Sequence, residues 1–317
     1  MPVYNDWEAA AIVCSALDVA CRRIGGARVS VLLVDDWSSA PLDPAPFARP
    51  RQSLSEVQLL RLRRNVGNQR AIAVALSFLY DRSDAQAVLV MDSDGEDKPE
   101  DAATLIERYL ANPQQAIFAE RRRRFDGRVF AVGYHLFRLV HWVLTGISVR
   151  IGNFSILPRA AAGAIVLTSE SWSHYAASAV KARIPMARVP MDRGRRVAGR
   201  SKMTLVGLVS HGLSAVSVFR ELVGTRLILA SVIASIGGAG LLALLGVLVI
   251  VHRIPFDRLT VTLLIVTLLA MVEGVFASFA ISFSVLAGNV GAPIIPGRDY
   301  HPFIASVTTL SGDRAAG

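Results

Sequence analysis

Two aspartates, Asp92 and Asp94, come directly after an aliphatic segment at Ala85–Met91. Carboxylates two residues apart in a loop converge on one hard cation, and Mg²⁺ or Mn²⁺ shares such oxygen ligands with substrate phosphates. A solvated turn explains an isolated Asp-x-Asp pair equally well. Here two more acidic residues, Glu96 and Asp97, follow in the same loop, which favours a site for a metal ion and a diphosphate.

A second acidic pair, Asp35 and Asp36, ends another aliphatic segment, Ala27–Val34. Uninterrupted aliphatic runs separated by helix-like segments are typical of strands buried on both faces of a mainly parallel sheet. In such sheets, ligands bind beyond the carboxyl ends of the strands. The two strands are therefore expected to deliver their carboxylates to one edge of the sheet.

Helices are expected between these strands, which makes the fold class α/β. The predicted helices are Trp7–Ile24, Gln69–Tyr80 and Asp101–Leu110, bounded by Gly-Gly, a polar turn and a proline;. The proline-containing segment Ser38–Ser53 is predicted to be a loop;. Together these elements form a first domain at residues 1–202, whose first strand is nearly absent from the sequence.

The second half of the chain has a composition suited to lipid. With 52% hydrophobic and 19% charged residues and only two cysteines, the chain is neither disordered nor a disulfide scaffold;. Leu227–Val251 lacks charge over about 25 residues, enough to cross a bilayer, and Leu259–Leu286 is a second apolar run, interrupted by Glu273;. We predict an interfacial amphipathic region at 203–226, a two-helix transmembrane hairpin at 227–287 and a C-terminal tail at 288–317.

The charge distribution predicts an anionic partner in or at a membrane. The formal net charge is +9, and a basic cluster at residues 195–202 lies shortly before the first apolar run. Lipid headgroups and phosphorylated lipids are the nearest anions there, whereas no nucleic-acid-binding motif is present. Met1 is followed at once by Pro2, Tyr4 and Asp6 and not by the basic and apolar run of a signal peptide, so the first domain is expected in the cytosol, at the plasma or inner membrane if the protein is bacterial;.

Five short motifs, taken in order, carry a family resemblance. They are Pro2–Asp6, Asp35–Ser38, Asn65–Ala71, Asp92–Glu100 and Arg196–Lys202. The chain resembles the membrane-anchored polyprenyl-phosphate glycosyltransferases of family 2, which have the GT-A fold and are related to dolichol-phosphate mannose synthase. The resemblance covers nearly the whole chain, including the transmembrane hairpin.

The resemblance implies where the nucleotide-sugar and its metal ion bind. Residues assigned to the nucleotide are Pro2, Tyr4, Asp6, Asp35 and Asp36. Residues assigned to Mg²⁺ or Mn²⁺ are Asp92, Asp94 and Glu96, where many relatives have Gln in place of Glu96. One departure affects the nucleotide pocket: Trp37 stands where Gly is usual in the relatives.

The resemblance also implies which residues lie near the phosphates. Arg196 and Lys202 are assigned to catalysis at the donor diphosphate and acceptor phosphate, together with Ser201. Arg121 and Arg123 fall in the arginine-bearing strand end of the relatives, and Asn153-Phe154 falls in a segment similar to their acceptor-side loop.

The implied reaction is inverting transfer of a sugar from a UDP- or GDP-linked donor to undecaprenyl or dolichyl phosphate. A phosphate monoester is largely ionised at pH 7, so the acceptor needs positioning more than a general base. Asp97 is the candidate for a base or an orienting group. Two alternatives stay open: a glycan or another lipid as acceptor, and an inactive nucleotide-binding membrane module. A homo-oligomer is also left open.

Overall fold

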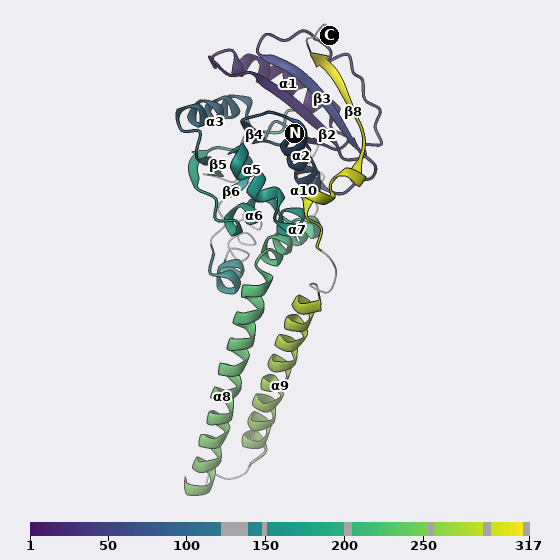
Figure 1. The fold of residues 1–317 in the computed structure, drawn as a ribbon. Coiled ribbons are helices and arrows are strands. Elements are labelled where there is room, and N and C mark those ends of the chain that lie inside the picture. The colour runs from purple at the N-terminus through teal and green to yellow at the C-terminus, as the bar shows by residue number, and fades with distance from the viewer. Residues whose placement is uncertain (122–138, 148–150, 200–204, 253–256, 288–292, 313–317) are drawn as a thin grey trace. The chain divides into compact units, whose positions relative to one another are not determined.

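A computed structural model describes residues 1–121, 139–147, 151–199, 205–252, 257–287 and 293–312 (Figure 1). The chain divides into two compact units. The first comprises Met1–Leu136, Ser148–Val218 and Ile294–Gly317, and the second comprises Phe137–Ile147 and Phe219–Pro293. The first unit contains the acidic motifs, and the second contains the two long apolar helices.

Two four-stranded sheets form the centre of the first unit. The first sheet contains, in spatial order, β1 (Pro2–Val3), β2 (Val29–Asp35), β3 (Leu54–Leu62) and β8 (Ile304–Gly312). The second contains β4 (Ala87–Val90), β6 (Ile151–Pro158), β5 (Ala116–Arg121) and β7 (Met186–Met191). The predicted strands at Ala27–Val34 and Ala85–Met91 correspond to β2 and β4.

The strand directions are mixed, whereas a mainly parallel sheet was expected. β1, β2 and β3 are parallel, as are β5 and β7. β8 is antiparallel to β3, and β6 is antiparallel to both of its neighbours, β4 and β5. The aliphatic runs correctly indicate burial on both faces, but burial carries no information about the direction of the neighbouring strand.

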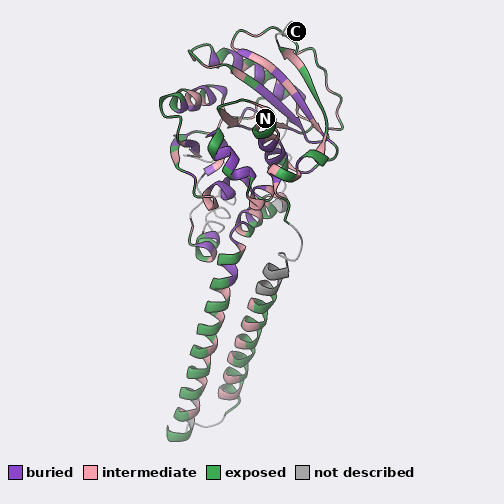
Figure 2. Cartoon of the chain, in the orientation of Figure 1, coloured by how far each residue is buried: buried purple, intermediate pink, exposed green. Residues whose placement is uncertain are grey.

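Strand β2 shows how both faces are covered. Val31 and Leu33 belong to a core cluster with α1 (Trp7–Cys21) and α3 (Pro99–Ala111). Leu32 and Val34, which point the other way, belong to a second cluster with α2 (Asn68–Arg82). Because successive side chains of a strand alternate between faces, a continuous aliphatic run is buried on both sides. The predicted α/β arrangement with flanking helices is confirmed (Figure 2).

The other helices of the first unit are short. They are α5 (Arg159–Val166), η1 (Ser169–Trp172), α6 (Tyr175–Lys181), α7 (Leu205–Ser217), α10 (Pro296–Asp299) and η2 (His301–Phe303). The three helices predicted for the first domain begin within two residues of α1, α2 and α3. The predicted amphipathic segment near residues 203–226 contains α7, where Val209 and Leu213, one helical turn apart, are both exposed.

The segment predicted to be a C-terminal tail contains a strand of the catalytic sheet. β8 pairs with β3 from Glu56 to Leu62. Tyr300, which is fully buried, precedes β8 and donates a hydrogen bond from its hydroxyl to Asp81 of α2 at 2.6 Å. Phe303 packs against Trp172 with their ring centroids 4.7 Å apart. The chain therefore returns to the first unit after the apolar helices.

The second unit contains two apolar helices, α8 (Arg220–His252) and α9 (Arg258–Ala287), which run side by side (Figure 1). Both are long and apolar enough to cross a membrane, and almost all of their side chains are at least partly exposed (Figure 2). Gly238 of α8 permits a close approach, since a Cβ atom there would clash with Met271 of α9. Residues 139–145 of the second unit are also helical.

Candidate active site

Acidic residues follow the carboxyl ends of three strands. Asp35 is the last residue of β2, Asp6 lies between β1 and α1, and Asp94 follows β4. The hydroxyl of Ser93 donates to the carbonyl oxygen of Pro2 at 2.7 Å, which joins the end of β1 to the loop after β4. The acidic segments of the two sheets therefore meet.

Asp36 organises the turn after β3. It is buried, and its two carboxylate oxygens accept hydrogen bonds from the backbone N–H groups of Val66 and Gly67 at 2.7 and 2.9 Å. Burial raises the pKa of Asp36, against the opposite effect of these two hydrogen bonds;. The turn places Asn68 at the start of α2, where its side-chain amide donates to Asp92 at 3.3 Å. Asp36 thus shapes the site through the backbone.

Asp35 is also satisfied within the protein. Its side chain is fully buried and accepts hydrogen bonds from the backbone N–H of Ser38 at 2.8 Å and from Nε of Arg61 at 2.9 Å. The Arg61 side chain is 44% exposed, so it links the buried carboxylate to the surface. Asp35 and Arg61 form a fixed ion pair beside the turn that Asp36 holds.

Two exposed aromatic residues lie on the segments next to this ion pair. Tyr4 is 43% and Trp37 is 54% exposed, and the segments that carry them are joined by a hydrogen bond from the N–H of Asn5 to the Ser38 hydroxyl at 2.8 Å. Trp37 has a φ of 62°, in the left-handed region that favours glycine;. This conformation explains why Gly is suited to the position, and Trp37 adopts it at a cost.

The loop after β4 is held by its own polar groups. The buried carboxylate of Asp97 accepts a hydrogen bond from the backbone N–H of Asp92 at 2.9 Å, and Oδ1 of Asp94 accepts one from the N–H of Glu96 at 2.9 Å. These contacts fold the acidic loop, residues 92–97, back on itself. In this arrangement, Asp97 orients the loop.

Residues 192–199, which follow β7 and are called here the arginine segment, cover the acidic loop. The guanidinium of Arg196 donates to Oδ2 of Asp6 at 2.9 Å and to Oδ2 of Asp94 at 2.8 Å. Arg193 forms an ion pair with Glu96. The side chains of Asp6, Asp94 and Arg196 are each no more than 21% exposed, so this is a largely desolvated cluster of charges.

Backbone contacts hold the same two segments together. The N–H of Gly194 donates to the carbonyl of Glu96 at 2.8 Å, and the N–H of Val197 donates to the carbonyl of Asp94 at 2.9 Å. A Cβ atom on Gly194 would lie 2.8 Å from the carbonyl oxygen of Gly95, closer than real Cβ contacts. Only glycine allows this approach, so the sequence of the arginine segment is adapted to the acidic loop.

Two of the predicted metal ligands, Asp94 and Glu96, are paired with arginines in this arrangement. Among the described residues, no group of three or more His, Cys, Asp or Glu side chains is placed to hold a metal ion. Asp94 and Glu96 supply suitable oxygen atoms, but each is engaged by an arginine. Burial, together with the nearby Asp92, raises the pKa of Asp94 even though Arg196 and Arg193 oppose the rise;. In this arrangement the Asp94 and Glu96 carboxylates are therefore paired with Arg196 and Arg193.

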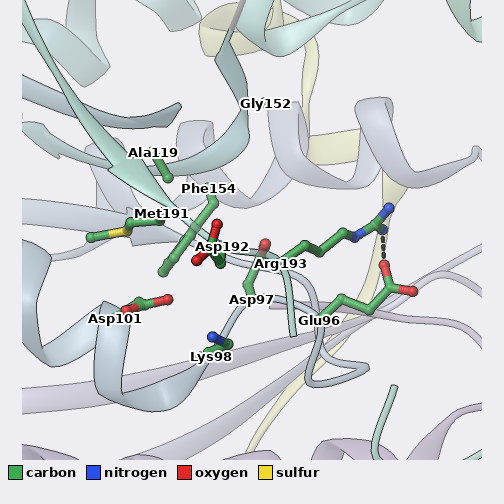
Figure 3. Close-up of a pocket in the computed structure, with 10 residues that line it drawn as sticks. All are labelled: Glu96, Asp97, Lys98, Asp101, Ala119, Gly152, Phe154, Met191, Asp192 and Arg193. Carbon is green, nitrogen blue, oxygen red and sulfur yellow. Dashed lines mark ion pairs between the residues drawn. The ribbon is translucent and has the colours of Figure 1, made fainter. Parts of the chain in front are cut away.

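A small pocket of about 20 Å³ lies behind the acidic loop (Figure 3). Asp97, Lys98, Asp101 and Phe154 line it, and Arg193 points from it toward Glu96. A volume of this size holds ordered water and not a nucleotide. Asp97 lies in this lining, which agrees with a role in orienting the acidic loop.

The residues predicted on the acceptor side are described only in part. Arg121 is the last residue of β5 and is paired with Met191 of β7, and nothing is described of its side chain. Arg123, Ser201 and Lys202 lie outside the described residues. Asn153 accepts a hydrogen bond from the Gln69 side chain at 3.2 Å, so the first turn of α2 contacts β6.

Three contributors to the site were not predicted from the sequence: Arg61, Asn68 and Arg193. Asn68 belongs to a quoted motif, but its contact with Asp92 depends on the turn that Asp36 holds. Arg193 precedes the predicted Arg196 by three residues in the same basic stretch, and Gly194 between them was the available signal. Arg61 carries no local signal, because it alternates with aliphatic residues along β3.

Comparison with known proteins agrees with this arrangement. The sequence model of glycosyl transferase family 2 matches residues 1–165, just over half of the chain. Curated proteins give no match. Among solved structures, S. aureus TarS (residues 1–349) is similar at 14% identity with a TM-score of 0.38; the match covers 72% of this chain and 63% of that one. On the family match, this chain belongs to glycosyl transferase family 2, and its fold is of the α/β, GT-A-like class.

Proposed function

We propose that the protein transfers a sugar from a nucleotide-sugar to a polyprenyl phosphate, with inversion at the anomeric carbon, at the cytosolic face of a membrane. The proposal rests on one observation: along the chain, the charged site is followed closely by the two apolar helices. The arginine segment ends at residue 199, α7 begins at Leu205 and α8 begins at Arg220. The predicted phosphate-binding residues, Ser201 and Lys202, lie in the short stretch between the site and α7.

The donor site is supported by the aromatic and acidic residues at the ends of β1 and β2. Tyr4 and Trp37 expose rings on which a nucleobase can stack, and stacking of this kind is worth about 1–3 kcal/mol per base;. Asp35 and the turn held by Asp36 supply fixed polar groups beside them. These features match a UDP- or GDP-linked donor in chemistry and do not choose between the two bases.

The membrane acceptor is supported by the two apolar helices. α8 and α9 contain stretches of 29 and 23 residues with a mean hydropathy of 2.3, and each is long enough to span a hydrocarbon core;. β7 precedes the hairpin and β8 follows it, and both strands belong to the first unit, so both ends of the hairpin connect to that unit. Two crossings return the chain to the side of the membrane that it left, as this connection requires.

The proposed reaction needs positive charge more than it needs a base. An oxygen of the polyprenyl phosphate attacks the anomeric carbon, the bond from that carbon to the donor diphosphate breaks, and the nucleoside diphosphate leaves. The attacking phosphate is largely ionised at pH 7, so no proton has to be removed. Charge that develops on the leaving diphosphate is stabilised by fixed cations, an effect that is typically worth a few kcal/mol.

Arg196 and Lys202 are proposed to supply that charge from the chain itself. Arg196 already lies at the junction of Asp6 and Asp94, where the donor diphosphate is expected. Asp97 is proposed to orient the acidic loop, because its carboxylate is occupied by the N–H of Asp92. Mg²⁺ or Mn²⁺ is proposed as the cofactor, and when bound it would add positive charge at the same diphosphate.

A donor-and-acceptor panel tests the proposal. The full-length protein in detergent is incubated with radiolabelled UDP- and GDP-sugars and a polyprenyl phosphate, and the organic phase is extracted and counted. We expect label in the organic phase with at least one donor, and loss of it in Asp94→Asn. Asp84→Asn is the matched control, since it makes the same chemical change at an exposed residue.

The alternatives give different results in the same panel. Transfer to a glycan or to a lipid without phosphate leaves the polyprenyl phosphate unlabelled and rejects the proposed acceptor. Binding of nucleotide without transfer from any donor points to an inactive module. Failure of every donor to label polyprenyl phosphate contradicts the proposed function.

A further inference from the structure

The arginine segment gives the acidic loop its own cations. Arg196 bridges Asp6 and Asp94, and Arg193 pairs with Glu96, so both predicted metal ligands beyond Asp92 are neutralised by the chain. A carboxylate oxygen that accepts a hydrogen bond from a guanidinium is not free to coordinate a divalent ion with the same lone pair. The arginines and a metal ion therefore compete for the same oxygen atoms.

We propose that Arg196 and Arg193 are the resident counter-cations of the acidic loop in the donor-free protein, and that a divalent metal ion displaces them when it binds with the nucleotide diphosphate. On displacement, the two guanidinium groups become available to the diphosphate. Arg196 is thus a positioning residue whose ligand changes from carboxylate to phosphate. The inference rests on the proposed donor class but not on the acceptor.

The unused hydrogen-bond donors of the two arginines indicate that they can exchange the carboxylates for another partner. The Nε atoms of both Arg193 and Arg196 are buried and have no hydrogen-bond partner among the described residues. A buried guanidinium that serves only structure normally has its donors satisfied, whereas unused donors are typical of functional sites. Both residues therefore keep hydrogen-bonding capacity that a diphosphate, rich in acceptors, can use.

The backbone contacts determine what moves in the exchange. The N–H groups of Gly194 and Val197 donate to carbonyls of the acidic loop, so the arginine segment is held at both ends of the ion pairs. If metal binding draws Asp94 and Glu96 away from the arginines, these two amides lose partners and exchange with solvent faster. The same segment continues through residues 200–204 into α7.

The first test is Mn²⁺ affinity, measured without nucleotide by calorimetric titration of the full-length protein. Arg196→Gln removes the competing cation, and we expect it to bind Mn²⁺ about tenfold more tightly than the wild type, because tenfold corresponds to 1.4 kcal/mol, the lower end for a charged hydrogen bond. Arg193→Gln is expected to act in the same direction. Arg195→Gln is the matched control: Arg195 lies between them but is exposed, and we expect an affinity within twofold of wild type.

An Arg196→Gln protein that binds Mn²⁺ no better than wild type overturns the inference. The second test needs no variant: hydrogen exchange of the peptide that covers residues 192–199, with and without Mn²⁺ and a nucleoside diphosphate. Faster exchange at Gly194 and Val197 supports the inference, and unchanged or slower exchange contradicts it. These outcomes are independent of sugar transfer. Tighter Mn²⁺ binding by Arg196→Gln without any transfer product supports the inference and rejects the proposed function. Unchanged Mn²⁺ binding by Arg196→Gln together with a transfer product rejects the inference and supports the proposed function.

Discussion

Replacing Asp36 by Asn tests whether the turn after β3 is held as the structure shows. The two backbone N–H groups of Val66 and Gly67 each point at one oxygen of the Asp36 carboxylate, at 2.7 and 2.9 Å. An asparagine side chain offers one oxygen acceptor and one NH₂ donor. One of the two backbone N–H groups therefore faces another donor and loses its hydrogen bond.

The cost follows from burial. Asp36 is 4% exposed, so water does not replace the missing acceptor, and an unsatisfied buried donor costs roughly 1–3 kcal/mol;. Removing a buried charge offsets part of this, because burial alone disfavours the ionised form of Asp36;. We expect a net loss of about 1.5 kcal/mol, which corresponds to a fall in melting temperature of roughly 3–6 °C for a domain of this size.

Thermal unfolding followed by tryptophan fluorescence measures the effect in the full-length protein in detergent. Asp84→Asn makes the same chemical change at an exposed residue and is expected to leave the melting temperature within about 1 °C, as surface substitutions usually do;. An Asp36→Asn protein as stable as this control would show that the two backbone hydrogen bonds do not hold the turn.

Three further substitutions follow from the same contacts. Asp18 accepts three backbone N–H bonds from residues 52–54, and these bonds outweigh burial and lower its pKa, so its contribution to stability is full above its ordinary pKa and is lost as the pH falls through the lowered value;. Asp18→Ala should therefore destabilise the protein more at pH 7 than at pH 3, in parallel melting curves. Gly95→Ala combines a φ of +84° with a Cβ atom 2.5 Å from Val197, so we expect a loss of about 1–2 kcal/mol by chemical denaturation, and an unchanged midpoint would contradict the packing;. Trp37→Gly relieves its positive φ and should keep the melting temperature, while nucleotide affinity weakens about tenfold if the indole stacks on the base, and an unchanged affinity in a titration would exclude that contact;.

The sequence predicted best those features that depend on local pattern. The aliphatic runs ending at Val34 and Met91 identified β2 and β4, and the two long apolar stretches identified α8 and α9. In each case a single physical requirement, burial on both strand faces or length across a bilayer, determines the residue types over many positions. Such segments are recognised without knowledge of their neighbours.

Features that depend on distant partners were missed. β8 lies in the segment predicted to be a tail, and it is a strand through its pairing with β3, more than 240 residues earlier in the chain. The antiparallel directions of β6 and β8 were not predicted, because strand direction is a property of the chain path and not of composition.

The candidate site divides in the same way. The strand ends predicted that the acidic residues after β2 and β4 lie at one edge, and the family resemblance placed Asp6 at the same site. The engagement of Asp94 by Arg196 and of Glu96 by Arg193 was not, because charges of opposite sign in sequence have no fixed distance until β7 brings residues 192–199 over the acidic loop. The sequence therefore predicted the carboxylates but not their present partners.

The central claim is that an ionised lipid phosphate is the nucleophile, and the most direct measurement compares two acceptors that differ only in that group. The full-length protein is given one radiolabelled nucleotide-sugar with either polyprenyl phosphate or the corresponding polyprenol, and the anomeric configuration of the lipid product is determined by NMR. We predict labelled lipid only with the phosphate, in the inverted configuration. Equal labelling of the polyprenol, or a product with retained configuration, would contradict the account.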